Sequence, residues 1–270
     1  DSEAVTVTVP PPGPVTRLSG QVITTGGAPL AGVRLEIDGD ETFSDANGDY
    51  QFSNLATTGT VRLLIDGSTV DPALGTFAVV PEVIAVVPGA DNLLDPPIVL
   101  LPLDVDSADP VNPNLTSVIT SARFVNGLEL HEPVTLTIPP GRAVIEGTGQ
   151  PFVGDIHISR IVDPKDGPRP LPPDIVLSAY IAIQPFGVVY PNPVPISFPN
   201  LEDFPPGSRM DFFALDHDTG VFEKIGEGLV SADGKTVDSI GGIVKSNSWH
   251  GIVDRKSTRL NSSHLVISYA

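Results

Sequence analysis

Cysteine is absent from this chain of 270 residues, and its absence excludes several kinds of chemistry at once. Disulfide bonds, thiolate metal sites and cysteine nucleophiles all require this residue. The absence of cysteine does not identify the cellular compartment, because large secreted β modules can fold without disulfides. An extracellular location is therefore compatible with the composition.

Basic residues are scarce. The chain holds 15 Lys and Arg against 33 Asp and Glu, which gives a formal net charge of −18. A surface that binds nucleic acid needs clustered Lys and Arg, and so does a surface that binds anionic lipid. We therefore predict no nucleic-acid partner. A net charge of this size favours solubility and attracts cations.

Long uninterrupted apolar runs are also lacking. A helix that spans a bilayer needs about 20 predominantly apolar residues. The most apolar stretch, 77–103, is broken by prolines and acids, so we predict strands with breaks there and no membrane span. The chain begins Asp1-Ser2-Glu3 without an initiator Met, and we expect it to be an internal piece of a longer protein.

Residues that favour helices are few, and residues that favour strands and turns are many. The chain has 5 Lys, 4 Gln and 1 Met, but 86 Val, Ile, Leu and Phe residues together with 26 Gly and 29 Pro. Branched apolar residues favour strands, and Gly and Pro favour turns. The composition predicts an all-β protein with a substantial core.

Short segments of alternating hydrophobicity occupy the first half of the chain. Predicted strands cover 18–25, 31–38, 50–52, 61–65, 77–80, 83–87 and 98–103. Seven short strands in about ninety residues, with turn residues between them, are typical of a β-sandwich. We predict one such domain over 17–103. A stiff Pro-rich linker over 1–16 precedes it, and a polar linker over 104–114 follows it.

A second β-rich region follows over 115–253, and it contains no convincing amphipathic helix. Predicted strands cover 115–124, 134–138, 155–162, 175–184, 194–198, 210–216, 221–225 and 243–253. Asp218-Thr219-Gly220 and Asp233-Gly234 are predicted hairpin turns, because Asp caps its own backbone and Gly accepts positive φ. The sequence thus predicts two β-sandwich domains in tandem.

The last residues, 254–270, differ from the rest in composition. Three basic residues, Arg255, Lys256 and Arg259, fall within five positions of an otherwise acidic chain. The segment DRKSTRLNSSHLVISYA resembles translated sequencing-adapter sequence found at the ends of metagenomic gene fragments. We therefore interpret it as an artefactual tail and exclude it from the fold prediction. The alternative is a natural basic tail.

Ordered motifs in the first half resemble the carboxypeptidase regulatory-like domains. The motifs are LSGQVI at 18–23, GAPLAGV at 27–33, SDANGDYQF at 44–52 and NL at 54–55. These domains are transthyretin-like, Ig-like β-sandwiches, similar in build to the B-type repeats of bacterial surface adhesins. The resemblance implies a non-catalytic module. It also implies that the turn 45–48 closes a hairpin and that Tyr50 and Phe52 point into the core.

The second half resembles, more loosely, the ZU5-like β-sandwiches. The residues concerned are VTLTIPPG at 134–141, GDIHIS at 154–159, IQPFGV at 183–188 and PVPISFP at 193–199. Some members of that family cleave themselves at a His-aromatic-Ser step. Here Ser248-Trp249-His250-Gly251 offers no hydroxyl after His250, so we predict no self-cleavage.

Calcium is the one metal for which the sequence offers a candidate site. Asp38, Asp40, Asp45, Asn47 and Asp49, together with Glu41, form an acidic run, and calcium takes six to eight oxygen ligands. The alternative is two exposed turns, in which Asp, Asn and Gly serve the backbone. The spacing of a helix–loop calcium motif is absent. We favour the turns.

Histidines and aromatic residues give little indication of a catalytic site. Asp216-His217-Asp218 reads as a surface hairpin, and His157 lies between two apolar strand residues, so it should face solvent. Trp249 is predicted to fill the core on the last strand. No HExxH, Walker, GxGxxG or GxSxG motif occurs, and we predict no enzyme activity and no cofactor.

One covalent device of adhesins can be tested by counting lysines. An intramolecular isopeptide bond needs a Lys, and residues 1–103 contain none. Of the lysines in the second half, Lys165 and Lys235 lie in loops. For Lys224 and Lys245 the sequence does not exclude such a bond.

The resemblances together indicate a non-catalytic spacer in a large secreted or cell-surface bacterial protein. Its expected partners are neighbouring β modules of the same polypeptide. The rival hypothesis is an accessory binding module for carbohydrate, protein or calcium in a secreted enzyme or adhesin. An enzyme is the third and weakest interpretation, because no residue pattern favours it.

Overall fold

The fold is all-β, as the composition predicts. A computed structural model describes residues 15–126, 129–167, 171 and 175–254. The described residues contain no α-helix, and no described helix is long and apolar enough to cross a membrane. Four short 3₁₀ turns occur at Gly67–Thr69, Pro72–Leu74, Val105–Ser107 and Pro164–Asp166. The predicted linker over 1–16 and the predicted tail over 254–270 fall almost wholly outside the described residues.

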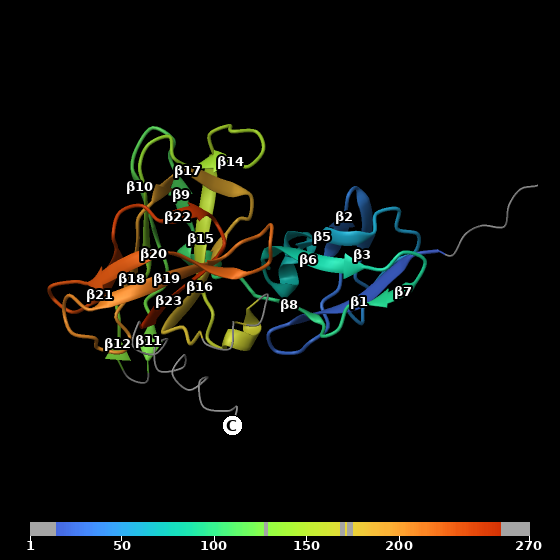
Figure 1. The fold of residues 1–270 in the computed structure, drawn as a ribbon, viewed down its shortest axis with the longest axis horizontal. Helices are drawn as coiled ribbons and strands as arrows, with labels where there is room; N and C mark the ends of the chain where they lie inside the picture. The colour runs from blue at the N-terminus through green and yellow to red at the C-terminus, as the bar shows by residue number, and fades with distance from the viewer. Residues whose placement is uncertain (1–14, 127–128, 168–170, 172–174, 255–270) are drawn as a thin grey trace, which may run out of the picture.

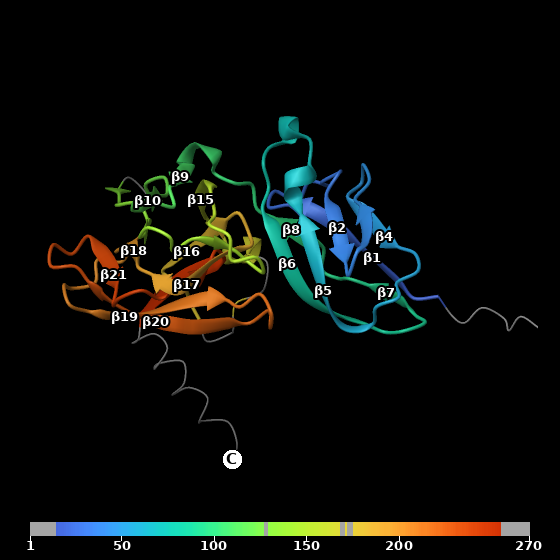
Figure 2. The ribbon, with the colours of Figure 1, turned by 90° about the horizontal axis from the view of Figure 1, so that it is seen from above.

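The strands form two lobes that lie end to end, with β1–β8 in the first and β9–β23 in the second (Figures 1 and 2). The first lobe has two sheets of four strands each. One contains β4 (Asp49–Phe52), β1 (Arg17–Thr24), β7 (Asp91–Leu93) and β8 (Ile98–Leu100). The other runs in the order β3 (Asp40–Phe43), β2 (Arg34–Ile37), β5 (Gly59–Asp66) and β6 (Val79–Val86).

Alternating side chains from both sheets build the core of the first lobe. Leu35, Ile37 and Leu63 are fully buried, and Tyr50 and Phe52 point inward as predicted, in edge contact with each other. Successive strand residues face opposite sides of a sheet, so the apolar residues of each strand share the inner face. Burial of these faces is the main force that holds the two sheets together.

The turn at 45–48 does not close a hairpin, which corrects that prediction. It links β3 to β4, and these strands lie in different sheets, because β3 pairs with β2 and β4 pairs with β1. Gly48 has φ +77°, and a Cβ at this position would lie 2.3 Å from the carbonyl oxygen of Val22. Glycine is therefore required at the crossing point between the sheets.

Pro81 does not break the strand in which it lies, although 77–80 and 83–87 were predicted as separate strands. A single strand, β6, runs through it and pairs with β5, with Leu64 opposite Pro81. Proline cannot donate a ladder hydrogen bond, and it is tolerated on an edge strand. β6 is such a strand, because β5 is its one partner in the sheet order. β3 and β7 are strands that the sequence pattern does not predict.

The main sheet of the second lobe has ten strands, and every neighbouring pair is antiparallel. Its order is β10 (Ser117–Thr120), β13 (Thr135–Ile138), β18 (Ile196–Pro199), β21 (Thr236–Ser239), β20 (Phe222–Val230), β19 (Arg209–Leu215), β23 (Trp249–Asp254), β16 (Ala179–Gln184), β15 (Gly154–Arg160) and β9 (Asp109–Val111). Two smaller sheets contain β11 (Val125–Asn126) with β12 (Glu129–Leu130), and β14 (Val144–Ile145), β17 (Val188–Val194) and β22 (Val244–Ser246).

The ten-stranded sheet curls until its two end strands, β10 and β9, nearly meet. The second lobe is therefore barrel-like and differs from the predicted β-sandwich, in which two separate sheets would stack. The backbone N–H of Thr120 in β10 donates to the carboxylate of Asp109 in β9 at 2.7 Å. Nearby, the N–H of Asn112 donates to the hydroxyl of Ser117 at 2.9 Å. Side chains thus bridge the gap and cover strand edges that would otherwise be open to association.

Part of the predicted linker over 104–114 belongs to this sheet. Residues 109–111 form β9 and pair with β15. The backbone N–H of Asp104 donates to the hydroxyl of Ser159 at 2.8 Å, so the start of this segment is also bonded to the second lobe. The connection between the lobes is therefore short, and hydrogen bonds hold it against the second lobe.

The two lobes share a continuous apolar core. The buried cluster of the first lobe extends into the second through six buried residues: Ile161, Tyr180, Ala182, Leu215, Phe222 and Trp249. Gln184 in β16 is 1% exposed, and its side-chain amide bonds both backbone groups of Val79 in β6, at 3.4 and 3.3 Å. Gln184 thus occupies the place of a partner strand beside the edge of β6.

Candidate functional site

The junction between the lobes gathers a cationic side chain, aromatic rings and two histidines. We call these residues the histidine cluster: Arg62, Phe186, His217, Trp249 and His250. Arg62 comes from β5 of the first lobe, and the other four come from the second lobe. Trp249 and His250 begin β23, His217 lies in the turn between β19 and β20, and Phe186 follows β16.

The rings of the histidine cluster form a chain of contacts across the junction. The guanidinium carbon of Arg62 lies 5.1 Å from the centre of the Phe186 ring. The ring of His217 stands edge-on to Phe186 at 4.9 Å and to Trp249 at 5.8 Å. A cation over an aromatic face and edge-to-face ring pairs are both favourable arrangements. The chain connects β5 of the first lobe to β23 of the second.

Both imidazoles bind backbone carbonyl groups of one short segment. Nε2 of His217 lies 3.2 Å from the carbonyl oxygen of Asn247, and Nε2 of His250 lies 3.2 Å from that of Ser246. A carbonyl oxygen only accepts, so each Nε2 carries the hydrogen. Among the described atoms, the buried Nδ1 atoms of both histidines have no hydrogen-bond partner. The surroundings thus fit the neutral form of each ring.

The segment that binds the histidines is itself held firmly. Asn247 is 1% exposed, and its side-chain oxygen accepts a hydrogen bond of 2.6 Å from the hydroxyl of Tyr190. Its side-chain nitrogen donates to the carbonyl of Pro185 at 2.9 Å. The hydroxyl of Ser248 donates to the carbonyl of Leu215 at 2.7 Å. Ser248 is therefore engaged by the backbone and is not paired with a histidine as a nucleophile would be.

Electrostatics favour the neutral form of both histidines. Burial lowers the pKa of His250 to about 4, the hydrogen bond with Ser246 opposes this, and the neighbouring His217 lowers it further. Burial also lowers the pKa of His217, and the charge of Arg62 acts in the same direction. The hydrogen bond to Asn247 opposes that shift. Both rings are thus uncharged at neutral pH.

A cavity of about 240 Å³ adjoins the two histidines. Charged residues of both signs line it: Glu146, Asp216, Asp218, Glu223 and Lys245. Within the part of the chain that the structure describes, no three His, Asp or Glu residues come together in a way that could hold a metal ion. The arrangement can respond to protonation, and it shows no pairing of a nucleophile with a base.

The five residues proposed for calcium lie in two separate turns and at the first positions of the strands that follow them. Asp38 occupies the turn between β2 and β3 with φ +47°, and Asp40 begins β3. The carboxylate of Asp45 accepts hydrogen bonds from the backbone N–H groups of Asn47 at 2.8 Å and Asp49 at 3.0 Å. Asp45 thus serves its own turn, which is the alternative that the sequence favoured.

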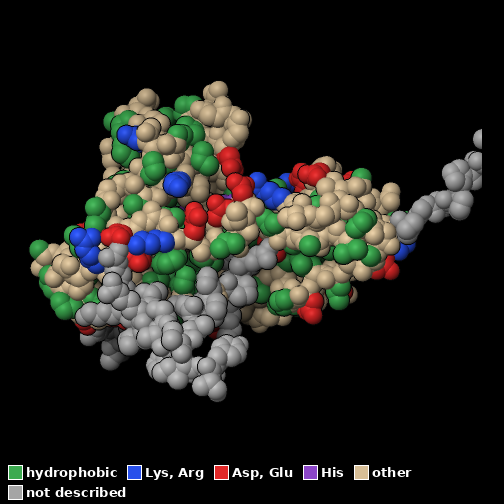
Figure 3. Space-filling model, viewed as in Figure 1, with side chains coloured by type: hydrophobic (Ala, Val, Ile, Leu, Met, Phe, Trp, Pro, Cys, Tyr) green, Lys and Arg blue, Asp and Glu red, His purple; other side chains and the backbone are tan. Residues whose placement is uncertain are grey.

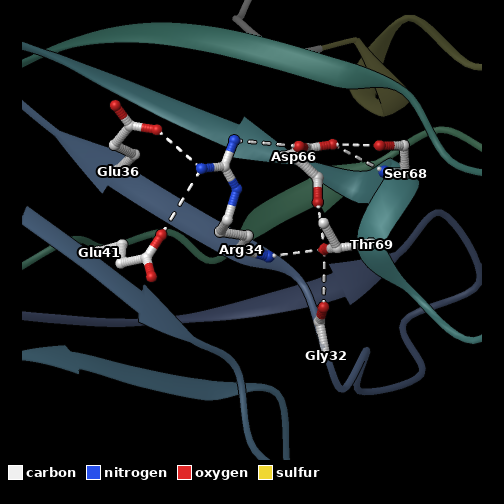
Figure 4. A network of polar contacts seen from close by, with 7 residues as sticks. All are labelled: Gly32, Arg34, Glu36, Glu41, Asp66, Ser68 and Thr69. Atoms are coloured by element: carbon white, nitrogen blue, oxygen red, sulfur yellow. Dashed lines mark hydrogen bonds and ion pairs between the residues drawn. The ribbon is translucent and has the colours of Figure 1, made fainter. Parts of the chain in front are cut away.

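Glu41, the neighbour of these residues, takes part in a different network (Figure 4). The guanidinium of Arg34 bonds Glu36 at 2.9 Å and Asp66 at 3.3 Å, and it lies 3.6 Å from Glu41. The hydrogen bond to Asp66 raises the pKa of Arg34. Four charges from β2, β3 and β5 therefore meet on the outer face of one sheet.

The Asp216-His217-Asp218 turn is partly as predicted. The carboxylate of Asp216 accepts hydrogen bonds from the backbone of Asp218 and from the backbone and hydroxyl of Thr219, at 2.7 to 3.0 Å. Partial burial opposes the charge, but these hydrogen bonds lower the pKa of Asp216 overall. The hairpin is present, but His217 turns inward against Phe186, a contact that the sequence pattern does not predict.

Trp249 lies where the pattern predicts it, whereas His157 faces solvent only in part, because its Nδ1 is buried. Trp249 is 1% exposed on the last strand, and His157 is half-buried between two fully buried isoleucines. Lys224 lies 3.0 Å from both Asp211 and Glu227. Partial burial opposes its charge, but the hydrogen bonds to these carboxylates raise the pKa of Lys224. This lysine is therefore an ammonium ion in an ion pair and not a neutral amine.

The first lobe has a larger and more open hollow of about 660 Å³ beside β1 and β4. Its lining includes Gln21, Phe43, Asp45, Gln51 and Leu93. Phe43 is 52% exposed and Leu93 is 72% exposed. Two exposed apolar side chains thus border a hollow that is open to solvent.

The chain matches no model of a known protein family, and a search of curated proteins finds none with significant similarity. The site therefore has to be interpreted from its own geometry.

Proposed function

We propose that this chain is a non-catalytic structural module, a spacer in a large secreted or cell-surface protein. Its partners are neighbouring β modules of the same polypeptide. The observation that carries the proposal is the shared core, in which residues such as Trp249 and Gln184 of the second lobe are buried at the junction with the first. Two lobes joined in this way act as one elongated body and can hold apart whatever they connect.

The path of the chain supports this role. β1 begins at the outer end of the first lobe, and β23, the last described strand, lies in the second lobe (Figures 1 and 2). The direction of the chain therefore follows the long axis of the molecule. On the face shown in Figure 3, hydrophobic side chains are scattered among polar ones. Together with a net charge of −18, this surface favours a soluble module that does not self-associate.

We assign the first lobe to the carboxypeptidase regulatory-like, transthyretin-like β-sandwiches, and the second lobe to the ZU5-like domains. The motifs at 18–55 and 134–199 support these assignments. Two facing four-stranded sheets also fit the first of them. Neither family requires a catalytic site in this chain.

Ligand titration tests the spacer proposal against the binding alternative. The purified chain is titrated with calcium chloride and with a panel of glycans, by isothermal calorimetry and by thermal unfolding. The spacer proposal expects no heat of binding and no shift of the melting temperature. A saturable heat that Phe43→Ala abolishes would assign a binding function to the open hollow of the first lobe and would overturn the spacer proposal. Val87→Ala, which changes an exposed residue outside that hollow, is the matched control.

A further inference from the structure

The histidine cluster lies where the two lobes meet, and a spacer does not require histidines there. Arg62 is the member from the first lobe, and it reaches His217 through the ring of Phe186. The backbone N–H of Phe186 also donates to the side-chain oxygen of Gln184 at 3.1 Å. Gln184 is the residue that bonds Val79 at the edge of β6. His217 is therefore connected, through Phe186, to the Arg62 contact and to the hydrogen bonds between Gln184 and Val79.

We propose that His217 and His250 form a pH-sensitive latch, which holds the lobes together while both rings are neutral and releases the first lobe when they are protonated. The inference concerns how the two lobes are held, and it stands whether or not the chain is a spacer.

A second proton on either ring has no acceptor in the closed arrangement. Nε2 already carries a hydrogen in each ring, so the added proton goes to Nδ1. That atom is buried in both histidines and faces no hydrogen-bond partner among the described atoms. A buried N–H without an acceptor is costly, and a buried unpaired charge costs more. His217 contacts Trp249 of the shared core, so opening of the junction would bring water to that side of its ring.

Charges around the ring do not offset this cost. From the first lobe, His217 faces the cation of Arg62, and from β23 it faces His250, so protonation sets like charges together. On its own turn it faces Asp216, whose carboxylate is engaged by Thr219, and Asp218, which is exposed.

The remaining charged groups line the adjoining cavity from β20, β22 and the turn after β14. They are Glu223, Lys245 and Glu146, and all three are exposed to solvent. Exposed charges are screened by water and salt, whereas buried charges are screened far less. Arg62 is exposed as well, so its charge is screened in the same way, and the cost of protonation comes from the buried Nδ1 atoms, which have no acceptor among the described atoms.

The absence of cysteine makes the test direct. Thr58→Cys in an exposed loop of the first lobe and Ala232→Cys in an exposed turn of the second place one dye on each lobe. We expect energy transfer between the dyes to fall reversibly from about pH 7 to about pH 4.5, while far-ultraviolet circular dichroism stays constant. Constant transfer over this range, or unfolding before any change in transfer, would overturn the proposal.

Substitution of the histidines identifies the cause. In the labelled chain, His217→Gln together with His250→Gln should remove the change in transfer, because glutamine does not titrate. The matched control, His131→Gln, changes a half-buried loop histidine of the second lobe outside the cluster and should leave the change intact. If the double variant keeps the pH response, the latch lies elsewhere and the proposal fails.

A measurement on the unaltered protein covers the case in which the double variant does not fold. Trp249 is the one tryptophan of the chain, it is 1% exposed, and it contacts His217. On release of the first lobe, acrylamide should quench its fluorescence several-fold more strongly at about pH 4.5 than at about pH 7. Equal quenching at both pH values, with the chain folded, contradicts the latch.

Discussion

Buried histidines make stability depend on pH, and His250 is the clearest case. Its pKa falls from 6.5 in the unfolded chain to about 4 in the folded one, so the unfolded chain binds more protons between these values. The contribution of His250 to the free energy of unfolding is therefore fully present above about pH 6.5, and it is lost as the pH falls to about 4. The difference in pKa corresponds to a loss of about 3 kcal/mol.

Denaturant titration at a series of pH values measures this loss. We expect His250→Gln to flatten the decline between about pH 6.5 and about pH 4, relative to the unaltered chain. Gln51→Ala, which changes an exposed side chain of β4, serves as the control and should follow the unaltered chain. Identical pH profiles for His250→Gln and the unaltered chain would show that the ring is charged or solvated in the folded state.

Two glycines with positive φ separate backbone strain from steric collision. Gly48→Ala would set a Cβ 2.3 Å from the carbonyl oxygen of Val22, whereas Gly39→Ala, at φ +90°, would meet nothing within 4 Å. The strain of a left-handed residue costs about 1 kcal/mol or more in both variants. Gly48→Ala should therefore be clearly the less stable of the two by thermal unfolding. Equal losses would contradict the close crossing of the sheets.

Residue patterns predict side chains within a strand better than side chains that meet across the fold. Alternation placed Tyr50 and Phe52 in the core and Trp249 on the last strand, because burial on a sheet follows a period of two. The inward position of His217 was not predicted, because Phe186, which it contacts, and Arg62, which contacts Phe186, lie far away in the sequence. The chain of rings exists only once the two lobes are in place.

Strand edges limit what can be predicted at the level of elements. Alternation and turn residues identified β1, β2 and β5, because each carries several apolar side chains on one face. β3 and β7 are short and polar, so they gave no such pattern. Pro81 misled the prediction, because a sequence does not reveal which strand will lie at an edge.

The side chain of Gln184 hydrogen-bonds the edge of β6, and substitution of Gln184 should lower the free energy of unfolding. Gln184→Ala would leave both backbone groups of Val79 without these side-chain partners. Loss of partners by buried polar groups costs about 1 to 3 kcal/mol, so denaturant unfolding should show a decrease of that order. Gln51→Ala, on the exposed side of β4, is the matched control and should change stability little. An unchanged stability for Gln184→Ala would mean that water replaces the amide.

At the scale of the whole molecule, the shared core determines whether the chain unfolds in one step or two. Six apolar residues of the second lobe are buried in a cluster with the core of the first. Burial of apolar surface between two units couples their stability, because neither can unfold without exposing surface on the other. We therefore expect a single calorimetric transition at neutral pH.

Phe186→Ala provides the contrast, because it removes the ring that connects Arg62 to His217 and leaves the strands of both lobes intact. A weakened junction should let the less stable lobe unfold first and split the transition in two. The unaltered chain should split in the same way near pH 4.5, if protonation of the histidines opens the same contacts. Two transitions in the unaltered chain at neutral pH would show that the shared core does not couple the lobes. The rigidity on which the spacer proposal depends would then be absent.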